Sequence, residues 1–296
     1  HYLVPEFHAE QEFKLSWTQL FDETDEALTA GYRVKPVLLG PLSYLWLGKT
    51  KGTAFDKLSL LPQLLAVYQQ ILQKLAAQKI EWVQIDEPVL ALDLPAEWQQ
   101  AYLSAYQQLQ GSGCKLLLTT YLGGIAHQLD WLPKLDVDGL HLDAVAGKNE
   151  LAPPLAAIPA HWQLSLGVIN GRNIWRANLH ELYAQLTELK QTHRDFWLGT
   201  SCSLLHSPID LQAEHGLESE IKSWFAFARQ KCTELHLLQR TLREPDDQKI
   251  LTLQAYSAPL RQRHNPFAYR MRPFRPQSRR SVRKMPNVTQ FMHCAQ

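Results

Sequence analysis

Cysteine is scarce in this chain of 296 residues, and long hydrophobic runs are absent from its sequence. The four cysteines, at positions 114, 202, 232 and 294, show neither Cys-x-x-Cys spacing nor a disulfide framework. No stretch reaches the ~18 consecutive apolar residues that a membrane span needs, and no signal peptide is visible. We therefore predict a cytoplasmic protein without a membrane partner.

Acidic residues are missing from the C-terminal part of the chain. Positions 248–296 hold ten Lys or Arg and no Asp or Glu, so the net charge of +1 divides into −9 for residues 1–247 and +10 for the remainder. A basic run of this kind could bind nucleic acid or an anionic membrane. Basic, proline-containing runs outside a fold are usually disordered, however, and have no groove-reading element. We expect a disordered tail over 265–296 and no nucleic-acid partner.

Apolar strands alternate with amphipathic helices along the rest of the sequence. We predict strands over Tyr2–Phe7, Val34–Gly40, Trp82–Asp86, Lys115–Tyr121, Gly139–Val145, Gln163–Ile169 and Phe196–Cys202. We predict helices over Leu58–Gln78, Ala96–Leu109, Leu179–Thr192 and Leu217–Thr241. Runs such as Val37-Leu38-Leu39 do not alternate polar with apolar residues, which is typical of a parallel sheet covered on both faces.

The ends of the predicted strands favour an α/β fold of the (β/α)8 TIM-barrel type. Several strands end in polar residues, and no Gly-x-Gly-x-x-Gly follows any strand, which argues against a doubly wound sheet. The sequence yields seven strands instead of the barrel's eight, and it begins at His1, without a methionine and inside a predicted strand. We expect an incomplete barrel whose first strand is missing.

Two adjacent carboxylates follow one of these strands. The segment Trp82-Val83-Gln84-Ile85-Asp86-Glu87-Pro88 places Asp86 and Glu87 at a strand's carboxyl end. In a parallel α/β protein the loops at that end form the binding site. An Asp in this position can also cap the next segment or pair with a neighbouring backbone. The segment alone leaves both interpretations open.

Five segments of the chain resemble one protein family. They are Tyr2-Leu3-Val4-Pro5-Glu6-Phe7, Lys35-Pro36-Val37-Leu38-Leu39-Gly40-Pro41, Trp82-Val83-Gln84-Ile85-Asp86-Glu87-Pro88, Ile169-Asn170-Gly171-Arg172-Asn173 and Ser201-Cys202-Ser203-Leu204-Leu205-His206-Ser207-Pro208. The chain resembles the N-terminal domain of cobalamin-independent methionine synthase from His1 to about His264. The resemblance implies two face-to-face (β/α)8 barrels and methyl transfer from 5-methyltetrahydropteroyltri-L-glutamate to L-homocysteine.

The resemblance also implies how the two barrels divide the work. Zinc, homocysteine and the folate head belong to the C-terminal barrel, where zinc turns the homocysteine thiol into a thiolate that is still nucleophilic. The N-terminal barrel mainly supports that barrel. We expect this chain to lack the catalytic barrel, to hold no zinc and to be inactive alone. The alternative is a supporting barrel that binds folate polyglutamate or the partner barrel.

Other residues occupy the positions that correspond to the family's zinc ligands. Thr119-Thr120-Tyr121 replaces the His-x-Cys segment, Asp143 stands at the Glu position and Cys202 at the final Cys position. Two possible ligands out of four do not make a tetrahedral zinc site. We therefore expect neither a metal ligand nor a catalytic residue in this chain.

Two histidines have competing interpretations. His141 lies two residues before Asp143, so both side chains share one strand face and could form a metal pair. A histidine in a packed barrel strand is more often held by a hydrogen bond, and we interpret His141 as structural. His206 follows Cys202 by four residues and could activate it, but the family implies no such role.

The remaining candidates lie at the predicted barrel mouth. Asp86, Glu87, Arg172 and Lys35 are the candidate substrate-binding residues, and Lys49 and Lys51 could extend a basic rim for a glutamate chain. The competing interpretation, a carboxylate pair held by Arg172, Lys35 or loop amides, is the favoured one. We assign residues 1–247 to the barrel, 248–264 to the start of an inter-barrel linker and 265–296 to the tail.

Overall fold

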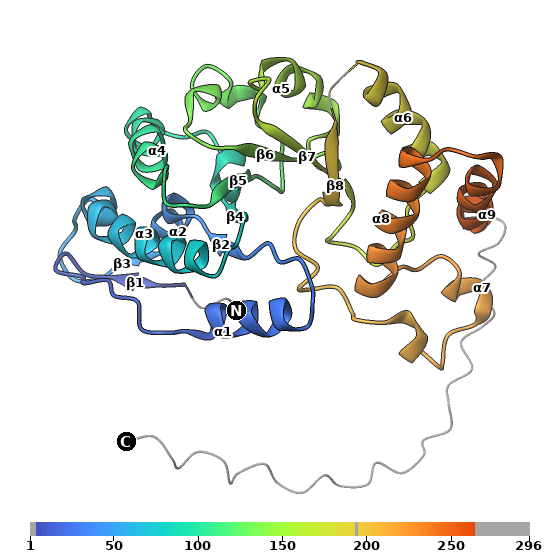
Figure 1. Cartoon of the computed structure of the whole chain (residues 1–296), viewed down its shortest axis with the longest axis horizontal. Coiled ribbons are helices and arrows are strands. Elements are labelled where there is room, and N and C mark those ends of the chain that lie inside the picture. Colours follow the sequence, from blue (N-terminus) through green and yellow to red (C-terminus); the bar gives the residue numbers. More distant parts are fainter. Residues whose placement is uncertain (1–3, 193–194, 264–296) are drawn as a thin grey trace, which may run out of the picture.

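A parallel sheet of six strands forms the centre of the computed structural model, which describes residues 4–192 and 195–263 (Figure 1). The strand order is β2-β4-β5-β6-β7-β8, and every pairing is parallel. The strands are β2 (Val37–Leu39), β4 (Trp82–Asp86), β5 (Lys115–Thr119), β6 (Gly139–Asp143), β7 (Gln163–Ile169) and β8 (Phe196–Thr200). The predicted parallel α/β fold is confirmed.

Helices connect and cover these strands. They are α1 (Gln19–Thr29), α2 (Pro41–Leu47), α3 (Leu61–Ala77), α4 (Ala96–Leu109), α5 (Ala152–Ala157), α6 (Leu179–Thr192), α7 (Ser219–Lys222), α8 (Ala228–Arg243) and α9 (Asp247–Arg263). The predicted bounds of β4, β7, α4 and α6 are confirmed residue for residue. None of the helices in the described part of the chain combines the length and the apolar character that a bilayer crossing requires.

The first predicted strand does not join the main sheet. Strand β1 (Glu6–Phe7) instead pairs in parallel with β3 (Lys49–Thr50), a strand that the sequence did not predict. Packing explains the difference, because the buried Phe7 ring lies against Gly48. A Cβ atom on Gly48 would come within 2.1 Å of that ring. Among the described residues the main sheet therefore contains six of the seven predicted strands.

The predicted helix Leu217–Thr241 is also interrupted. It divides into α7 and α8, and between them Phe225 forms an isolated antiparallel bridge with Trp175. The two rings pack with centroids 5.1 Å apart. This aromatic contact joins the segment before α8 to the loop after β7. The residues between α7 and α8 are therefore not helical.

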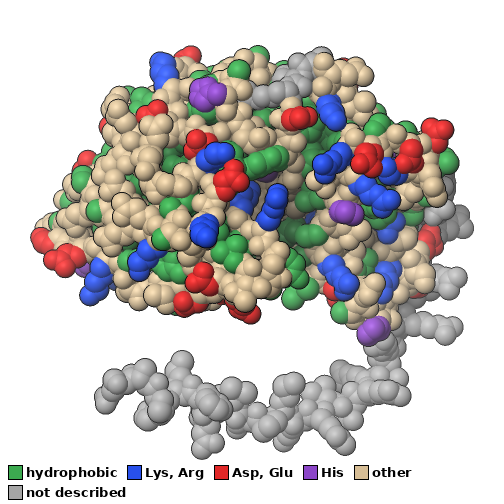
Figure 2. Space-filling model, in the orientation of Figure 1, with side chains coloured by type: hydrophobic (Ala, Val, Ile, Leu, Met, Phe, Trp, Pro, Cys, Tyr) green, Lys and Arg blue, Asp and Glu red, His purple; other side chains and the backbone are tan. Residues whose placement is uncertain are grey.

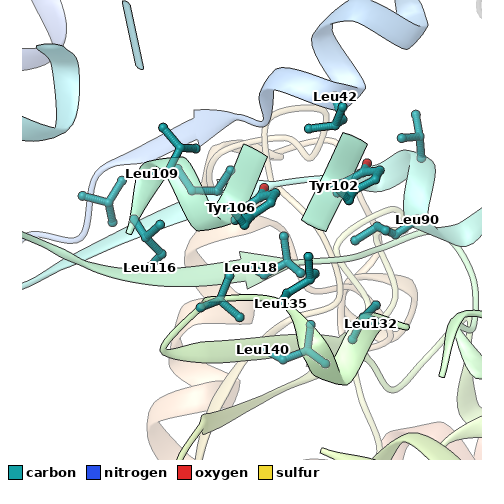
Figure 3. Packing of buried hydrophobic residues seen from close by; sticks show 14 of the residues in the cluster. Leu42, Leu90, Tyr102, Tyr106, Leu109, Leu116, Leu118, Leu132, Leu135 and Leu140 are labelled. Carbon is teal, nitrogen blue, oxygen red and sulfur yellow. The ribbon is translucent and has the colours of Figure 1, made fainter. Parts of the chain in front are cut away.

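The outer face of the sheet packs against the helices. Alternate residues of the strands, such as Ile85, Leu118 and Leu140, belong to one hydrophobic cluster with residues of α2, α3 and α4. Figure 3 shows Tyr102 and Tyr106 of α4 between Leu42 and the leucines of β5. Side chains alternate across a strand, so the positions between these residues face the other side of the sheet.

The sheet curls around that second, inner face. Trp82 on β4 and Trp197 on β8 touch edge to face, with ring centroids 4.9 Å apart, although three strands separate them in the sheet. Only a curved sheet brings these side chains together, as in a barrel wall. Among the described residues β2 and β8 remain edge strands, and Val37 and Leu39 on β2 are 49% and 39% exposed. Hydrophobic side chains reach the surface in the middle of the face in Figure 2.

Glu87, directly after β4, joins three elements through one buried carboxylate. Its Oε1 atom accepts hydrogen bonds from the Leu42 N–H at 3.2 Å and the Tyr106 hydroxyl at 3.1 Å. Its Oε2 atom accepts from the Ser43 N–H at 2.7 Å and the Tyr102 hydroxyl at 3.0 Å. The two amides belong to the first turn of α2 and have no partner within that helix. Glu87 thereby ties β4 to α2 and α4.

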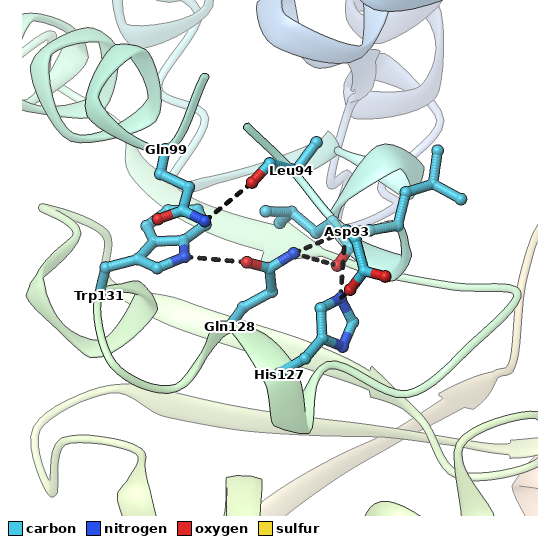
Figure 4. Close-up of polar contacts among 8 residues, drawn as sticks. Asp93, Leu94, Gln99, His127, Gln128 and Trp131 are labelled. Atoms are coloured by element: carbon cyan, nitrogen blue, oxygen red, sulfur yellow. Dashed lines mark hydrogen bonds and ion pairs between the residues drawn. The ribbon is translucent and has the colours of Figure 1, made fainter. Parts of the chain in front are cut away.

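The loops after β4 and β5 are tied together by side-chain amides (Figure 4). Gln128 donates to the Leu92 carbonyl at 2.7 Å and to the Leu90 carbonyl at 3.3 Å. Its own carbonyl accepts from the Trp131 indole N–H at 2.9 Å, and a ring nitrogen of His127 lies 3.1 Å from the Leu92 carbonyl. These bonds hold the two loops as one piece of the sheet's carboxyl-end rim.

Helix α9 covers most of the range that we assigned to a linker, and it is bonded to the body of the fold. The Tyr256 hydroxyl donates to Glu234 of α8 at 2.9 Å, and the Ser257 hydroxyl accepts from the His180 N–H of α6 at 3.2 Å. The division of the chain at position 247 stays a prediction. The tail over 265–296 lies outside the described residues.

Replacing Glu87 by Ala should destabilise the fold strongly. The change leaves two backbone amides and two tyrosine hydroxyls buried without their acceptor, and each unpaired buried donor costs about 1–3 kcal/mol. We expect the free energy of unfolding in urea to fall by at least about 3 kcal/mol. Glu10→Ala, at an exposed position, is the control and should change it by less than about 0.5 kcal/mol. Equal effects of the two substitutions would contradict the anchoring role.

Stability should also depend on pH through Glu87. Burial raises the pKa of its carboxyl from 4.5 to about 7, although its hydrogen bonds oppose the rise. The folded chain thus holds this proton more tightly than the unfolded chain, so the contribution is present below pH 4.5 and is lost as the pH rises to about 7. At about 1.36 kcal/mol per pH unit, the loss is about 3 kcal/mol.

The comparison of the wild type with Glu87→Gln isolates this effect, because Gln does not titrate. Urea unfolding of both proteins between pH 4.5 and 8 should show their stability difference changing by about 3 kcal/mol, in the direction that disfavours the wild type at high pH. A difference that stays constant with pH would show that Glu87 does not titrate in this range.

Candidate functional site

One row of residues crosses the inner face of all six strands. The strand register aligns Leu39 with Asp86, Asp86 with Thr119, Thr119 with His141, His141 with Ser165 and Ser165 with Trp197. We call these six residues the inner row. Four of them are polar, at positions that a closed barrel would surround. The row includes Asp86, which the sequence analysis named as a candidate binding residue, and Thr119, at a position that corresponds to a zinc ligand. It also includes His141, which we interpreted as structural.

Asp86 lies in this row as a nearly buried carboxyl, 9% exposed. Gln84, two residues earlier on the same face, donates to its Oδ1 at 2.8 Å. Burial raises the pKa of Asp86, and the Gln84 amide, the Lys35 charge and the Tyr121 hydroxyl lower it to a smaller extent. The carboxyl is therefore held among polar neighbours that can also present it to a ligand.

Lys35, just before β2, is exposed overall, and its side chain extends toward the inner face. Its Nζ atom lies 5.9 Å from the centroid of the Trp197 ring on β8, at the other edge of the sheet. Burial of the ammonium lowers the pKa of Lys35, and Asp86 partly restores it. The structure thus brings together two of the four predicted substrate-binding residues, Lys35 and Asp86.

The other two candidates lie elsewhere. Glu87 points away from the inner row and accepts hydrogen bonds from two amides in the first turn of α2 and from two tyrosines of α4. Helix amides and tyrosines thus hold it, where the sequence favoured Arg172, Lys35 or loop amides. Arg172 is exposed in the loop after β7, where its N–H donates to the Asn170 side chain at 2.8 Å. The lysines expected to form a basic rim are also dispersed. Lys49 lies on β3, which belongs to the small second sheet, and Lys51 directly follows that strand and forms an ion pair with Glu6.

His141 is packed into the row as a neutral ring. Its Nδ1 atom lies 2.8 Å from the Ser165 hydroxyl, and the side chain is buried. Burial, assisted by the charge of Lys35, lowers the pKa of His141 to about 4, against a raising effect of the Thr200 backbone. A Cβ atom on Gly167 would stand 2.8 Å from the ring, so the neighbouring strand leaves no room beside it. The geometry agrees with a structural role.

The positions that correspond to zinc ligands differ in their surroundings. Thr119 is buried, and its hydroxyl has no hydrogen-bond partner among residues 4–192 and 195–263. Both carboxylate oxygens of Asp143 are occupied by loop amides, those of Leu122, Val145 and Ala146, at 2.8–3.0 Å. Burial raises the pKa of the Cys202 thiol, which opposes the thiolate that zinc requires. No group of three or more His, Cys, Asp or Glu side chains in the described ranges could hold a metal ion.

Several polar residues that hold this region together were not predicted from the sequence. Gln84 could have been found, because Trp82, Gln84 and Asp86 alternate on one strand face. Tyr102 and Tyr106 carried no such signal, since tyrosines four residues apart on a helix predict only core packing. Ser165 became visible only through the register that places it beside His141.

Comparison with known proteins identifies the family. The family model described as "Cobalamin-independent synthase, N-terminal domain" matches residues 1–194. A 5-methyltetrahydropteroyltriglutamate–homocysteine methyltransferase of Yersinia enterocolitica is 58% identical over 272 residues, which cover 90% of this chain and 36% of that protein. A protein of the same name from Photorhabdus laumondii is 60% identical over 263 residues, covering 89% and 34%. The chain thus spans about a third of the length of these relatives.

Solved structures show the same fold at low sequence identity. A putative vitamin-B12-independent methionine synthase from Listeria monocytogenes matches with a TM-score of 0.58 and 14% identity, over 81% of this chain and 72% of that chain. A B12-independent methionine synthase from a Shewanella species, solved with selenomethionine, gives 0.59 and 15%, over 81% and 71%. With the extent of the family match, these findings place the chain in the cobalamin-independent methionine synthase family, as its N-terminal domain.

Proposed function

We propose that this chain is a supporting, non-catalytic barrel in the transfer of a methyl group from 5-methyltetrahydropteroyltri-L-glutamate to L-homocysteine, which yields methionine. The names of the relatives support the reaction. The observation that supports the non-catalytic role is the state of the positions where the resemblance would place zinc ligands. Thr119 offers a hydroxyl instead of a soft ligand, and loop amides donate three hydrogen bonds to the carboxylate of Asp143.

The chemistry of the reaction explains why this matters. The homocysteine sulfur must lose its proton before it can attack, and a bound zinc ion supplies that activation by stabilising the thiolate. The protonated state of Cys202 at neutral pH and the neutral ring of His141 offer no equivalent. We infer that zinc and the chemical step belong to another part of the full-length enzyme, in a reducing cytoplasm. The described cysteines, which are free thiols, agree with that compartment.

A second part of the proposal concerns the carboxyl-end rim as a docking face for the catalytic barrel. The loops that follow β4, β5 and β8 expose Leu92, Leu122, Leu205 and Ile209, of which the last two are each 81% exposed. Exposed leucines and isoleucines gathered on one face are typical of an interface. The loops after β4 and β5 are cross-bonded through Gln128, so this part of the face is preformed.

The chain alone should make no methionine. Purified protein supplied with zinc, L-homocysteine and 5-methyltetrahydropteroyltri-L-glutamate should give product at the background rate, because we find no group in the described residues that could hold zinc and activate the thiol. The full-length Yersinia relative, assayed in parallel by chromatography of methionine, is the positive control. Turnover by the chain above the protein-free background would refute the non-catalytic assignment.

Charging the rim should weaken docking. In a binding assay with the separately expressed C-terminal part of the Yersinia relative, the double variant Leu205→Asp with Ile209→Asp should raise the Kd by about tenfold or more. Tyr32→Asp is the matched control, because Tyr32 is 70% exposed but lies in the turn that leads to the amino end of β2. If both variants bind as tightly as the wild type, the rim is not the docking face.

A further inference from the structure

A cavity of about 210 Å³ lies outside the inner row, between the loop after β6 and the beginning of α6. Lys148 contributes from the β6 side, and Asn170, Asn173 and Arg176 contribute from the loop after β7. Glu181, in the first turn of α6, completes the polar part of the wall. None of these five residues belongs to the inner row.

Two positive charges border this cavity. Lys148 is exposed, and its ammonium has no hydrogen bond or ion pair with any other residue in the described ranges. Arg176 is fixed by its guanidinium, which donates to the Tyr256 carbonyl at 3.1 Å and stacks 4.3 Å from the centroid of the Tyr256 ring. The amino end of α6, a helix of 14 residues, adds a partial positive charge. The electrostatics of this wall favour a carboxylate.

Two asparagine side chains add hydrogen-bond donors. The Asn170 carbonyl accepts from the Arg172 N–H at 2.8 Å. The Asn173 carbonyl accepts from the Trp175 N–H at 3.1 Å and from the Lys231 ammonium at 3.2 Å. With both carbonyls engaged, their amide N–H groups are the ends left to bind a ligand.

One negative charge is held in place at the same cavity. Asn178 donates to Oε2 of Glu181 at 3.1 Å, and Gln185 donates to Oε1 at 3.1 Å. Each carboxylate oxygen keeps lone pairs for a further donor. The Glu181 carboxylate, fixed by these two hydrogen bonds, would attract the ammonium group of a ligand.

The rest of the wall is apolar. Val145, Val168, Leu182 and Trp175 line the cavity, and the Trp175 ring is supported by Phe225. A water molecule occupies ~30 Å³ in the liquid, so the cavity has the volume of about seven water molecules. This is the size of a small amino acid with a short aliphatic side chain.

We propose that this cavity binds a free α-amino acid with a short aliphatic side chain. Its carboxylate would contact Lys148 and the asparagine amides, its ammonium would contact Glu181, and its side chain would lie on the apolar wall. The proposal goes beyond methyl transfer and does not depend on it, because none of the inner-row residues takes part. Failure of either proposal leaves the other standing.

A matched set of probes tests the pairing of charges. L-2-Aminobutyrate carries both charges, butyrate only the carboxylate and butylammonium only the ammonium. Calorimetric titration of the full chain should give the lowest Kd for L-2-aminobutyrate, by about tenfold or more over either half. Equal affinities for the three probes, or no binding of L-2-aminobutyrate, would overturn the proposal.

Two substitutions assign the contacts. Lys148→Met should raise the Kd for L-2-aminobutyrate and for butyrate by about tenfold, since it removes the carboxylate's partner and keeps the length of the side chain. Glu181→Gln should abolish the preference for L-2-aminobutyrate over butyrate while leaving the Kd for butyrate unchanged. Lys134→Met, at an exposed lysine that does not line the cavity, is the control and should change none of the three values.

The controls keep the outcome unambiguous. Circular dichroism and thermal unfolding should match the wild type for all three variants, because Lys148, Glu181 and Lys134 are exposed. A folded Lys148→Met variant that binds L-2-aminobutyrate as tightly as the wild type would place the ligand elsewhere and refute the site.

Discussion

The buried carboxylate of Glu87 is the interaction on which the arrangement of this fold depends. It is the residue that follows β4, and it accepts hydrogen bonds from the first turn of α2 and from two tyrosines of α4. The carboxylate is closely packed, because a Cβ atom on Gly40 would collide with the Glu87 side chain. Its neighbour Asp86 consequently faces the opposite side of the strand. Glu87 therefore bonds to the helices, and Asp86 lies on the inner face of the sheet.

The inner row shows how strand register gathers polar side chains on one face of a sheet. Asp86, Thr119, His141 and Ser165 lie side by side through strand register alone. Burial disfavours the charged forms of both Asp86 and His141. The carboxylate oxygens of Asp143 accept hydrogen bonds from loop amides. The inner face of the sheet therefore carries several buried polar groups whose charged forms are disfavoured by burial or whose oxygens accept hydrogen bonds from backbone amides.

Much of the fold was predictable because local patterns determine it. The strand Trp82–Asp86 and the helix Ala96–Leu109 have the predicted bounds, since a buried parallel strand and an amphipathic helix each leave a periodic signature. The sequence did not predict which sheet the strand at Glu6–Phe7 joins or where the helix Leu217–Thr241 is interrupted, because contacts distant in sequence decide both. Phe7 lies against Gly48, and Phe225 pairs with Trp175. Neither contact has a local signal.

The candidate site divides in the same way between sequence and tertiary structure. The sequence by itself determined the family, the parallel α/β class, the carboxylates after one strand and the absence of soft ligands at Thr119 and Tyr121. Only the tertiary structure decided that Lys35 and Asp86 share an interior, that Glu87 is an anchor, and that Lys148 and Glu181 border one cavity. The physical reason is that strand register and sheet curvature bring these side chains together from segments far apart along the chain, and side-chain chemistry alone does not encode that geometry.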